Sequence, residues 1–348
     1  MKAALLLLLC LLSQASACLW DRDTLAHEAA GNMNVVHTAV GWFDRNPELY
    51  YQMRLDRLSK ELEAGTDDLS LYDDAAVAAD RLGKSDEAIK WMKEKAKRIP
   101  KMASDIERLE QQYRYHANLG TFYAHRWIHQ SPESRKADLS DLARAELEIS
   151  RAIEINEEAH FGREKYQLAV IKWLRGPYVT HKFLLGHCPL PGISDEDSEN
   201  ATVGLCGLVQ LGAAWRSPDV YRMICYYVSN QSAGALASLT YQRVKELNGN
   251  QPHTLHPGWD EDSQAGLIIR PKREEGEYYA QEPEDLKKVI NFYKQARQAA
   301  HQRHLERTEY MLAKLEAGEH PDTHRDFWNG WKSPTFPKIP GRPANVRK

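Results

Sequence analysis

Histidine and cysteine side chains gather in two stretches of this chain. His181, His187 and Cys188 lie close together, and His253 and His256 follow in an H-x-x-H spacing. Imidazole nitrogens and thiolates are preferred ligands of zinc and copper. The stretches around these five residues are therefore one place where a metal-binding or enzymatic site is possible.

Cys188 also has a structural interpretation, which we favour. A disulfide from Cys188 to Cys206 or Cys225 would anchor the same stretch if the chain works in an oxidising compartment. The cysteines do not form C-x-x-C pairs, so the spacing does not indicate a zinc ribbon. Spacing alone does not choose between the partners of Cys188.

Other catalytic signatures are missing from the sequence. There is no G-x-S-x-G, no P-loop and no dinucleotide-binding glycine pattern. His125 and His129 are one helical turn apart, but no H-E-x-x-H surrounds them, and a surface position is the simpler interpretation. We therefore predict a protein that is not an enzyme and that has no cofactor and no resident metal.

The first residues have the layout of a secretory signal peptide. Met1-Lys2 supplies a positive start, an apolar run follows from Ala3 to Leu12, and Ser13 to Ala17 ends in an A-x-A pattern. The apolar run is shorter than the ~20 residues that a membrane-spanning helix needs. The pattern predicts that residues 1–17 are removed and that the chain is exported.

Cys18 would then be the first mature residue. Ala15-Ser16-Ala17-Cys18 resembles a bacterial lipobox, although Ala15 stands where leucine is usual. Two interpretations remain open: lipidation of Cys18, or ordinary cleavage that leaves an unmodified thiol. The corresponding locations are an outer-membrane-anchored lipoprotein, or a periplasmic or secreted protein.

The composition excludes some partners. The chain has 46 Lys and Arg against 49 Asp and Glu, a net charge of −3. Such a balance argues against nucleic acid, which favours a basic surface. No second long apolar stretch occurs, so we expect no transmembrane helix in the mature chain.

The dominant periodicity is helical. Asn46-Pro47 opens an apolar three- and four-residue repeat that ends near Gly65, because Asn can cap a helix and Pro suits its first turn. Residues 71–82 and 86–98 form a second and a third helix, separated by Gly83-Lys84-Ser85. Acidic residues open the third helix and basic residues close it, as the helix dipole favours.

This helix pair resembles a tetratricopeptide repeat (TPR). The matching positions are Tyr72, Ala75, Ala76, Gly83, Ala88, Met92 and Pro100. Weaker copies are identified at Asn118 to Tyr123 with Ala145 to Ile155, at Ala159 to Leu174, and at Leu208 to Trp215 with Ala237 to Val244. The resemblance implies an all-α, TPR-like array of helix hairpins in a right-handed superhelix, with loop insertions.

The predicted organisation follows from these patterns. An N-terminal helical segment (18–66) precedes the degenerate array (67–247), and a loop insertion (248–282) contains one short candidate strand, Leu267 to Ile269. A C-terminal helical cap (283–332) ends in a Pro-rich basic tail (333–348) that we expect to be disordered.

The resemblance also implies a binding groove lined by the first helix of each repeat. The positions that correspond are Asp73, Val77, Asp80, Arg114, Asn118, Thr121, Glu164, Gln210 and Arg216. Asp73 and Asp80 are close to two helical turns apart and should share a face. That face is either a solvated acidic surface or a patch that receives a basic or polar peptide. The mixed charges do not form a clamp for a peptide carboxylate, so we expect a protein surface or a segment of the same chain there.

The sequence thus predicts an exported, TPR-like scaffold that mediates protein–protein binding or assembly at a bacterial cell envelope. The alternative is a metal-binding protein or enzyme whose site lies around His181, His187, Cys188, His253 and His256.

Overall fold

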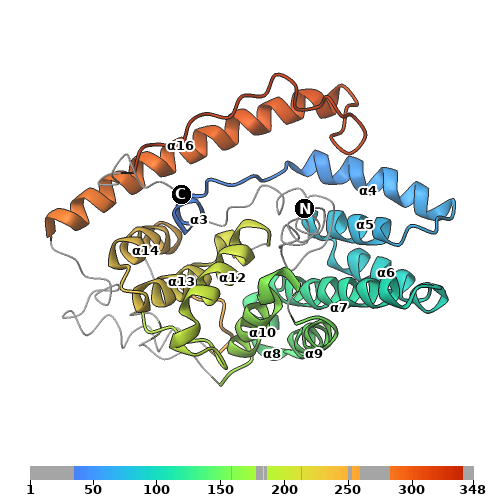
Figure 1. Ribbon diagram of the computed structural model, residues 1–348, viewed down its shortest axis with the longest axis horizontal. Coiled ribbons are helices and arrows are strands. Elements are labelled where there is room, and N and C mark those ends of the chain that lie inside the picture. The colour runs from blue at the N-terminus through green and yellow to red at the C-terminus, as the bar shows by residue number, and fades with distance from the viewer. Residues whose placement is uncertain are drawn as a thin grey trace, which may run out of the picture.

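The computed structural model describes residues 35–157, 159–177, 183, 186–212, 214–249, 253–258 and 283–339. Within these ranges the chain forms twelve α-helices and no strand, which confirms the predicted all-α class. Figure 1 shows helix pairs packed side by side, with one long helix lying across them. The predicted signal peptide, Cys18 and the candidate strand at 267–269 lie outside the described residues.

The first helices match the periodicity of the sequence. α4 spans Glu48–Glu63, α5 spans Ser70–Arg81 and α6 spans Ser85–Ala96. Gly83 turns the chain between α5 and α6 with φ of 75°, a left-handed conformation that glycine adopts without a steric penalty. Buried alanines at positions 75, 76 and 88 let these helices approach closely.

The second pair joins α7 (Asp105–Ile128) to α9 (Ser140–Ile155) through the short α8 (Pro132–Ala137). The Ser104 hydroxyl accepts a hydrogen bond from the Glu107 amide and caps α7. α7 and α9 cross at Gly120, where an added Cβ would lie 2.7 Å from Ile149 Cγ1 and 3.1 Å from the Ala145 carbonyl oxygen. The crossing therefore requires a residue without a side chain.

The remaining pairs enclose the largest apolar core. α10 spans Arg163–Leu174, α12 Ser198–Gln210, α13 Pro218–Asn230 and α14 Gly234–Asn248. The helix predicted over Leu208 to Trp215 is wrong in extent: α12 ends at Gln210, and residues 214–216 form a 3-10 turn. A new helix begins just beyond it, at Pro218, with Ser217 as its cap.

One long helix closes the array, as the sequence predicts. α16 spans Pro283–Glu316 and packs against α14, α4 and α3, which spans Val35–Val40. In Figure 1 it runs across the top of the molecule, beside the extended segment that links α3 to α4. The predicted disorder of the tail is wrong for residues 333–339, because Phe336 packs edge-on against Trp42 and Phe292. Residues 340–348 lie outside the described part.

Among the described residues, no helix combines the length and apolar character required to cross a membrane.

The Gly120 crossing gives a test of the hairpin. Replacing glycine by alanine inside a helix usually stabilises it by about 1 kcal/mol. Gly120→Ala should instead destabilise by about 1–3 kcal/mol, because the new methyl overpacks against Ile149 and the Ala145 backbone. Denaturant unfolding measures the change.

Gly120→Ala combined with Ile149→Val should recover part of the loss, since Ile149 Cδ1 lies 2.8 Å from the added carbon. A single Gly120→Ala variant with raised stability would show that α7 and α9 do not pack this closely.

Candidate functional site

The residues predicted to line a groove lie along one polar seam. Asp73, on α5, accepts hydrogen bonds from Lys95 Nζ of α6 at 2.6 and 2.8 Å and from Asn118 Nδ2 of α7 at 3.1 Å. Two turns along α5, Asp80 contacts His125 Nδ1 of α7 at 2.6 Å. The expectation that Asp73 and Asp80 share a face is confirmed, and the face they share is turned toward α7.

The seam continues from α7 to α10. Gln167 Nε2 donates to Thr121 Oγ1 at 2.9 Å, and the Tyr113 hydroxyl donates to Glu164 Oε1 at 2.7 Å. All four side chains are buried. We use the term polar seam for this set of residues: Asp73, Asp80, Lys95, Tyr113, Asn118, Thr121, His125, Glu164 and Gln167.

Three of these four contacts between α5, α7 and α10 have similar sequence separations, and Tyr113 with Glu164, 51 residues apart, is the exception. Asp73 and Asn118 are 45 residues apart, Asp80 and His125 are also 45 apart, and Thr121 and Gln167 are 46 apart. Equal offsets at two points show that α5 and α7 run parallel and in register. The first helix of the α5–α6 pair therefore packs on α7, the first helix of the next pair.

These contacts correct the prediction of an open groove. Asp73, Val77, Asp80, Asn118, Thr121, Glu164 and Gln210 are buried. Gln210 Nε2 donates to Thr38 Oγ1 at 2.7 Å. Of the other two positions, Arg114 pairs with Glu110 on its own helix, and Arg216 is exposed beside Trp215. Asp73 and Asp80 form neither a solvated acidic surface nor a peptide-binding patch. Helices of the same chain pack against them, which agrees with the expectation of a segment of the same chain there.

Burial dominates the electrostatics of the seam. The side chains of Lys95 and Asp73 are 0% and 2% exposed. Burial raises the pKa of Asp73, while Lys95 and its hydrogen bonds act in the opposite direction. Burial likewise lowers the pKa of Lys95 against the attraction of Asp73. Desolvation thus outweighs the attraction, as is common for buried ion pairs. The pair specifies how α5 and α6 fit and contributes little net stability.

The alternative site in the loops does not assemble among the described residues. His187 is exposed and packs edge-on against Tyr226 at 5.3 Å. His253 is exposed, whereas His256 is buried with its Nε2 2.9 Å from the Trp173 carbonyl oxygen. His181 lies outside the described residues. No group of three His, Cys, Asp or Glu side chains suited to a metal occurs in the described part of the chain.

The predicted disulfide is also not formed. Cys188, Cys206 and Cys225 are buried thiols in the same apolar core. Cys188 Sγ lies 3.0 Å from the Phe183 carbonyl oxygen and Cys225 Sγ 3.5 Å from that of Ala237. Two of the thiols thus donate to backbone carbonyls, Cys188 five residues back along the chain and Cys225 across to α14. Burial raises the pKa of Cys206 to about 12. A high thiol pKa makes Cys206 a poor nucleophile and metal ligand.

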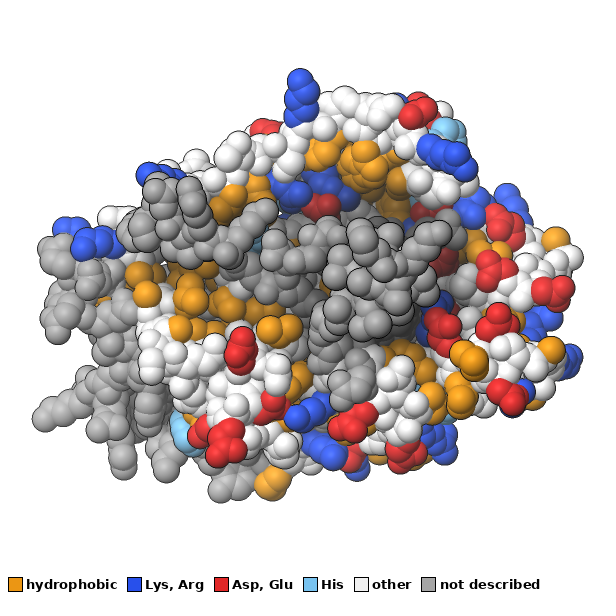
Figure 2. Space-filling view, viewed as in Figure 1, with side chains coloured by type: hydrophobic (Ala, Val, Ile, Leu, Met, Phe, Trp, Pro, Cys, Tyr) orange, Lys and Arg blue, Asp and Glu red, His pale blue; other side chains and the backbone are white. Residues whose placement is uncertain are grey.

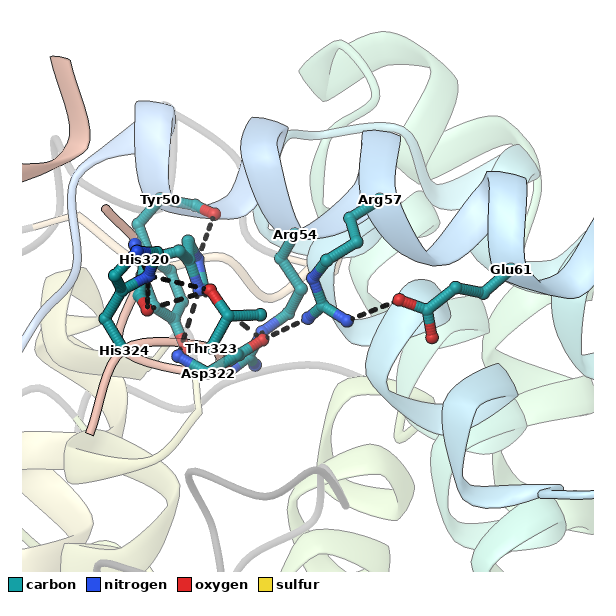
Figure 3. Close-up of polar contacts among 8 residues, drawn as sticks. All are labelled: Tyr50, Arg54, Arg57, Glu61, His320, Asp322, Thr323 and His324. Atoms are coloured by element: carbon teal, nitrogen blue, oxygen red, sulfur yellow. Dashed lines mark hydrogen bonds and ion pairs between the residues drawn. The ribbon is translucent and has the colours of Figure 1, made fainter. Parts of the chain in front are cut away.

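A second polar cluster joins α4 to the C-terminal segment (Figure 3). Asp322 accepts hydrogen bonds from Arg54 Nη2 at 2.7 Å and Arg54 Nε at 2.9 Å. It also accepts one from Arg57 Nη2 at 2.6 Å. Arg54 lies 4.6 Å from the centre of the Tyr50 ring, and His320 stacks on the same tyrosine at 4.6 Å. We call this cluster the terminal clamp.

The clamp contains His320, Asp322 and His324 in an H-x-D-x-H spacing that our sequence interpretation missed. Such a spacing is compatible with metal binding, but the side chains here are engaged in internal contacts. His320 Nε2 is 3.1 Å from the Tyr50 carbonyl oxygen, and its Nδ1 accepts from the Asp322 amide at 3.1 Å. Both Asp322 oxygens bind arginine. The arrangement is that of a structural clamp.

Comparisons with protein-family models, curated proteins and solved structures found no match for this chain. Its own geometry therefore carries the functional argument.

The buried ion pair yields a stability prediction. Lys95→Met should destabilise the protein by about 3–5 kcal/mol, because Asp73 then stays buried without its cation. Asp73→Asn combined with Lys95→Met should recover most of this loss, since the amide oxygen still accepts from Asn118. Urea unfolding of the three proteins provides the comparison.

Lys93→Met, at an exposed position of the same helix, is the matched control and should change stability by less than about 0.5 kcal/mol. Equal effects of Lys93→Met and Lys95→Met would refute the buried pair.

Proposed function

We propose that this chain is an exported, TPR-like scaffold that binds a protein partner at a bacterial cell envelope and has no catalysis of its own. The observation that carries the proposal is the offset of 45 residues that recurs at two points between α5 and α7, followed by an offset of 46 residues between Thr121 of α7 and Gln167 of α10. Serial packing of equivalent helices is the architecture of repeat proteins, which use extended surfaces for binding. The offset exceeds the 34 residues usual for a TPR.

Because the residues of the polar seam are buried, we propose that the contact surface lies on the outside of the array. Ile106 and Leu109 occupy adjacent turns at the start of α7 and are 82% and 53% exposed. A single exposed apolar side chain is ordinary, but two that share a helix face form a surface that a partner can cover. We place the partner contact at Ile106 and Leu109.

Site-specific crosslinking tests this assignment. A photoreactive amino acid at Ile106 or Leu109 should give discrete adducts with the same protein in an envelope extract of the source organism. The same probe at Lys172, an exposed position of α10, should not. The double variant Ile106→Glu, Leu109→Glu should lose the captured protein, because burying a charge without a partner opposes binding.

Gln295→Glu combined with Gln298→Glu adds the same charge at two exposed positions of α16 and serves as the control. An unchanged yield of partner with the Ile106 and Leu109 variant would refute this contact surface. A chain that gives no adduct from either position would remove the scaffold proposal.

The location is a second part of the proposal and rests on Met1 to Cys18. If Cys18 is acylated, the protein should fractionate with membranes and Cys18→Ser should release it or block its processing. Stable attachment generally takes more than one acyl chain, because a single one binds reversibly. Mass spectrometry of the native N-terminus distinguishes the cases: an unmodified Cys18 would exclude the anchor and leave a periplasmic or secreted protein.

A further inference from the structure

One arginine stands apart from the other partly buried arginines. Arg45 lies in the extended segment between α3 and α4, with its guanidinium 5.0 Å from the Phe43 ring centre and 4.6 Å from that of Trp215. Among the described residues, no carboxylate or carbonyl group pairs with this guanidinium. By contrast, Arg54 and Arg126 each bind an aspartate through two nitrogens.

The surroundings of Arg45 are cationic. Burial, then Arg297, Arg243 and Arg216, lowers the pKa of Arg45 to about 10. Glu246 lies in the same region, but its oxygens are bound by Arg243 at 2.6 Å and by Arg297 at 3.0 Å. We call Arg45, Arg216, Arg243 and Arg297 the basic cluster. Its positive charge exceeds the negative charge of Glu246.

The excess of positive charge continues along α16. Burial, followed by Arg45 and Arg307, lowers the pKa of His304 to about 4. Asp44 is close to this stretch, and it pairs with Arg303 at 2.7 Å and Arg307 at 3.5 Å. Figure 2 shows Lys and Arg side chains gathered beneath α16, on the side that faces the body of the molecule.

Gly41 lies beside two of these guanidinium groups. Its φ of 79° is strained for any residue with a side chain. A Cβ added there would lie 3.3 Å from Arg297 Nη1 and 3.7 Å from Arg45 Nη1. Both guanidinium groups therefore approach the same short stretch of backbone, where Arg297 Nη1 also lies 3.4 Å from the Val40 carbonyl oxygen.

We propose that Arg45 and Arg297 bind a phosphate group beside Gly41, with Arg216 drawing the anion in from the exposed side. Guanidinium groups match phosphate oxygens in geometry and form charge-assisted hydrogen bonds with them. Arg216 contacts the Trp215 ring at 4.6 Å and, like Arg45, has no acidic partner among the described residues.

The charge of the cluster favours phosphate over a carboxylate. In the described part of the chain, Arg45 and Arg216 have no carboxylate partner, and a phosphate monoester carries about −1.5 to −2 charges at neutral pH. A single carboxylate would offset only one of them. Inorganic phosphate, a phosphorylated small molecule and the headgroup of an anionic phospholipid all present this chemistry.

Calorimetric titration of the full chain with inorganic phosphate, in chloride buffer, tests the site. We expect saturable binding that Arg45→Gln weakens about tenfold, the loss expected for one charge-assisted hydrogen bond. Arg216→Gln should weaken binding less, because it acts at longer range. Arg151→Gln, which removes a partly exposed arginine from α9, should leave the affinity unchanged.

Thermal unfolding separates binding from folding. At one phosphate concentration, phosphate should raise the melting temperature of the unmodified protein and of Arg151→Gln more than that of Arg45→Gln. Without phosphate, Arg45→Gln should melt at or above the unmodified protein, since a repelled, partly buried charge is removed. If Arg45→Gln does not fold, the exposed Arg216→Gln variant must still weaken phosphate binding for the proposal to stand.

Vesicles distinguish the sources of the phosphate group. Arg45-dependent binding to phosphatidylglycerol but not to phosphatidylcholine vesicles would assign a lipid headgroup, and calorimetric binding of phosphate alone would assign a small ligand. Absence of saturable binding to both phosphate and phosphatidylglycerol would overturn the proposal. Equal weakening by Arg45→Gln and Arg151→Gln would overturn it as well, because the attraction would then be that of net charge.

Discussion

The pairing of buried polar side chains between α5, α7 and α10 constrains the rest of the array. Asp73 and Asp80 each accept from a residue of α6, Lys95 and Ser85 respectively, but they keep their partners on α7 only when Asn118 and His125 lie at matching heights. Sliding α7 by one turn would leave both carboxylates buried without these partners, at a cost of several kcal/mol. Apolar packing alone tolerates such shifts far better. The polar seam therefore specifies register, and the apolar contacts around it supply the driving force for folding.

The terminal clamp applies the same constraint to the two ends of the described chain. Arg54 and Asp322 are separated by 268 residues, yet their side chains are 0% and 2% exposed. The clamp is possible because α16 has 34 residues and spans about 50 Å, at a rise of ~1.5 Å per residue. α16 thus packs against α14 at one end of the array and against α4 at the other. The open faces that a row of hairpins leaves are covered by the chain itself.

Periodicity predicted the helices and the shared face of Asp73 and Asp80, but not what lies opposite that face. A spacing of seven residues fixes two side chains on one side of a helix, whereas their environment depends on a partner 45 residues away. Lys95 illustrates the difference: the sequence placed it in the last turn of a helix as a dipole partner, and the fold buries it against Asp73. His320, Asp322 and His324 of the terminal clamp, and Arg45, carry no periodic signal, because they lie in segments between or beyond helices. Their roles come from contacts that only the assembled array creates.

The treatment of buried charge sets Arg45 apart from the structural residues. Arg54, Arg126 and Arg222 each bind a carboxylate, and this attraction offsets the free-energy cost of removing their charges from water. Among the described residues, Arg45 contacts two aromatic rings, is attracted by Tyr221 and is repelled by three neighbouring arginines. A cation–π contact contributes about 0.5–2 kcal/mol, which is small against repulsion from like charges in a partly desolvated site. The position is therefore poorly explained by folding and well explained by an anion that completes it. The polar seam and the terminal clamp therefore stabilise the array, whereas the basic cluster beneath α16 is the proposed site for a phosphate group.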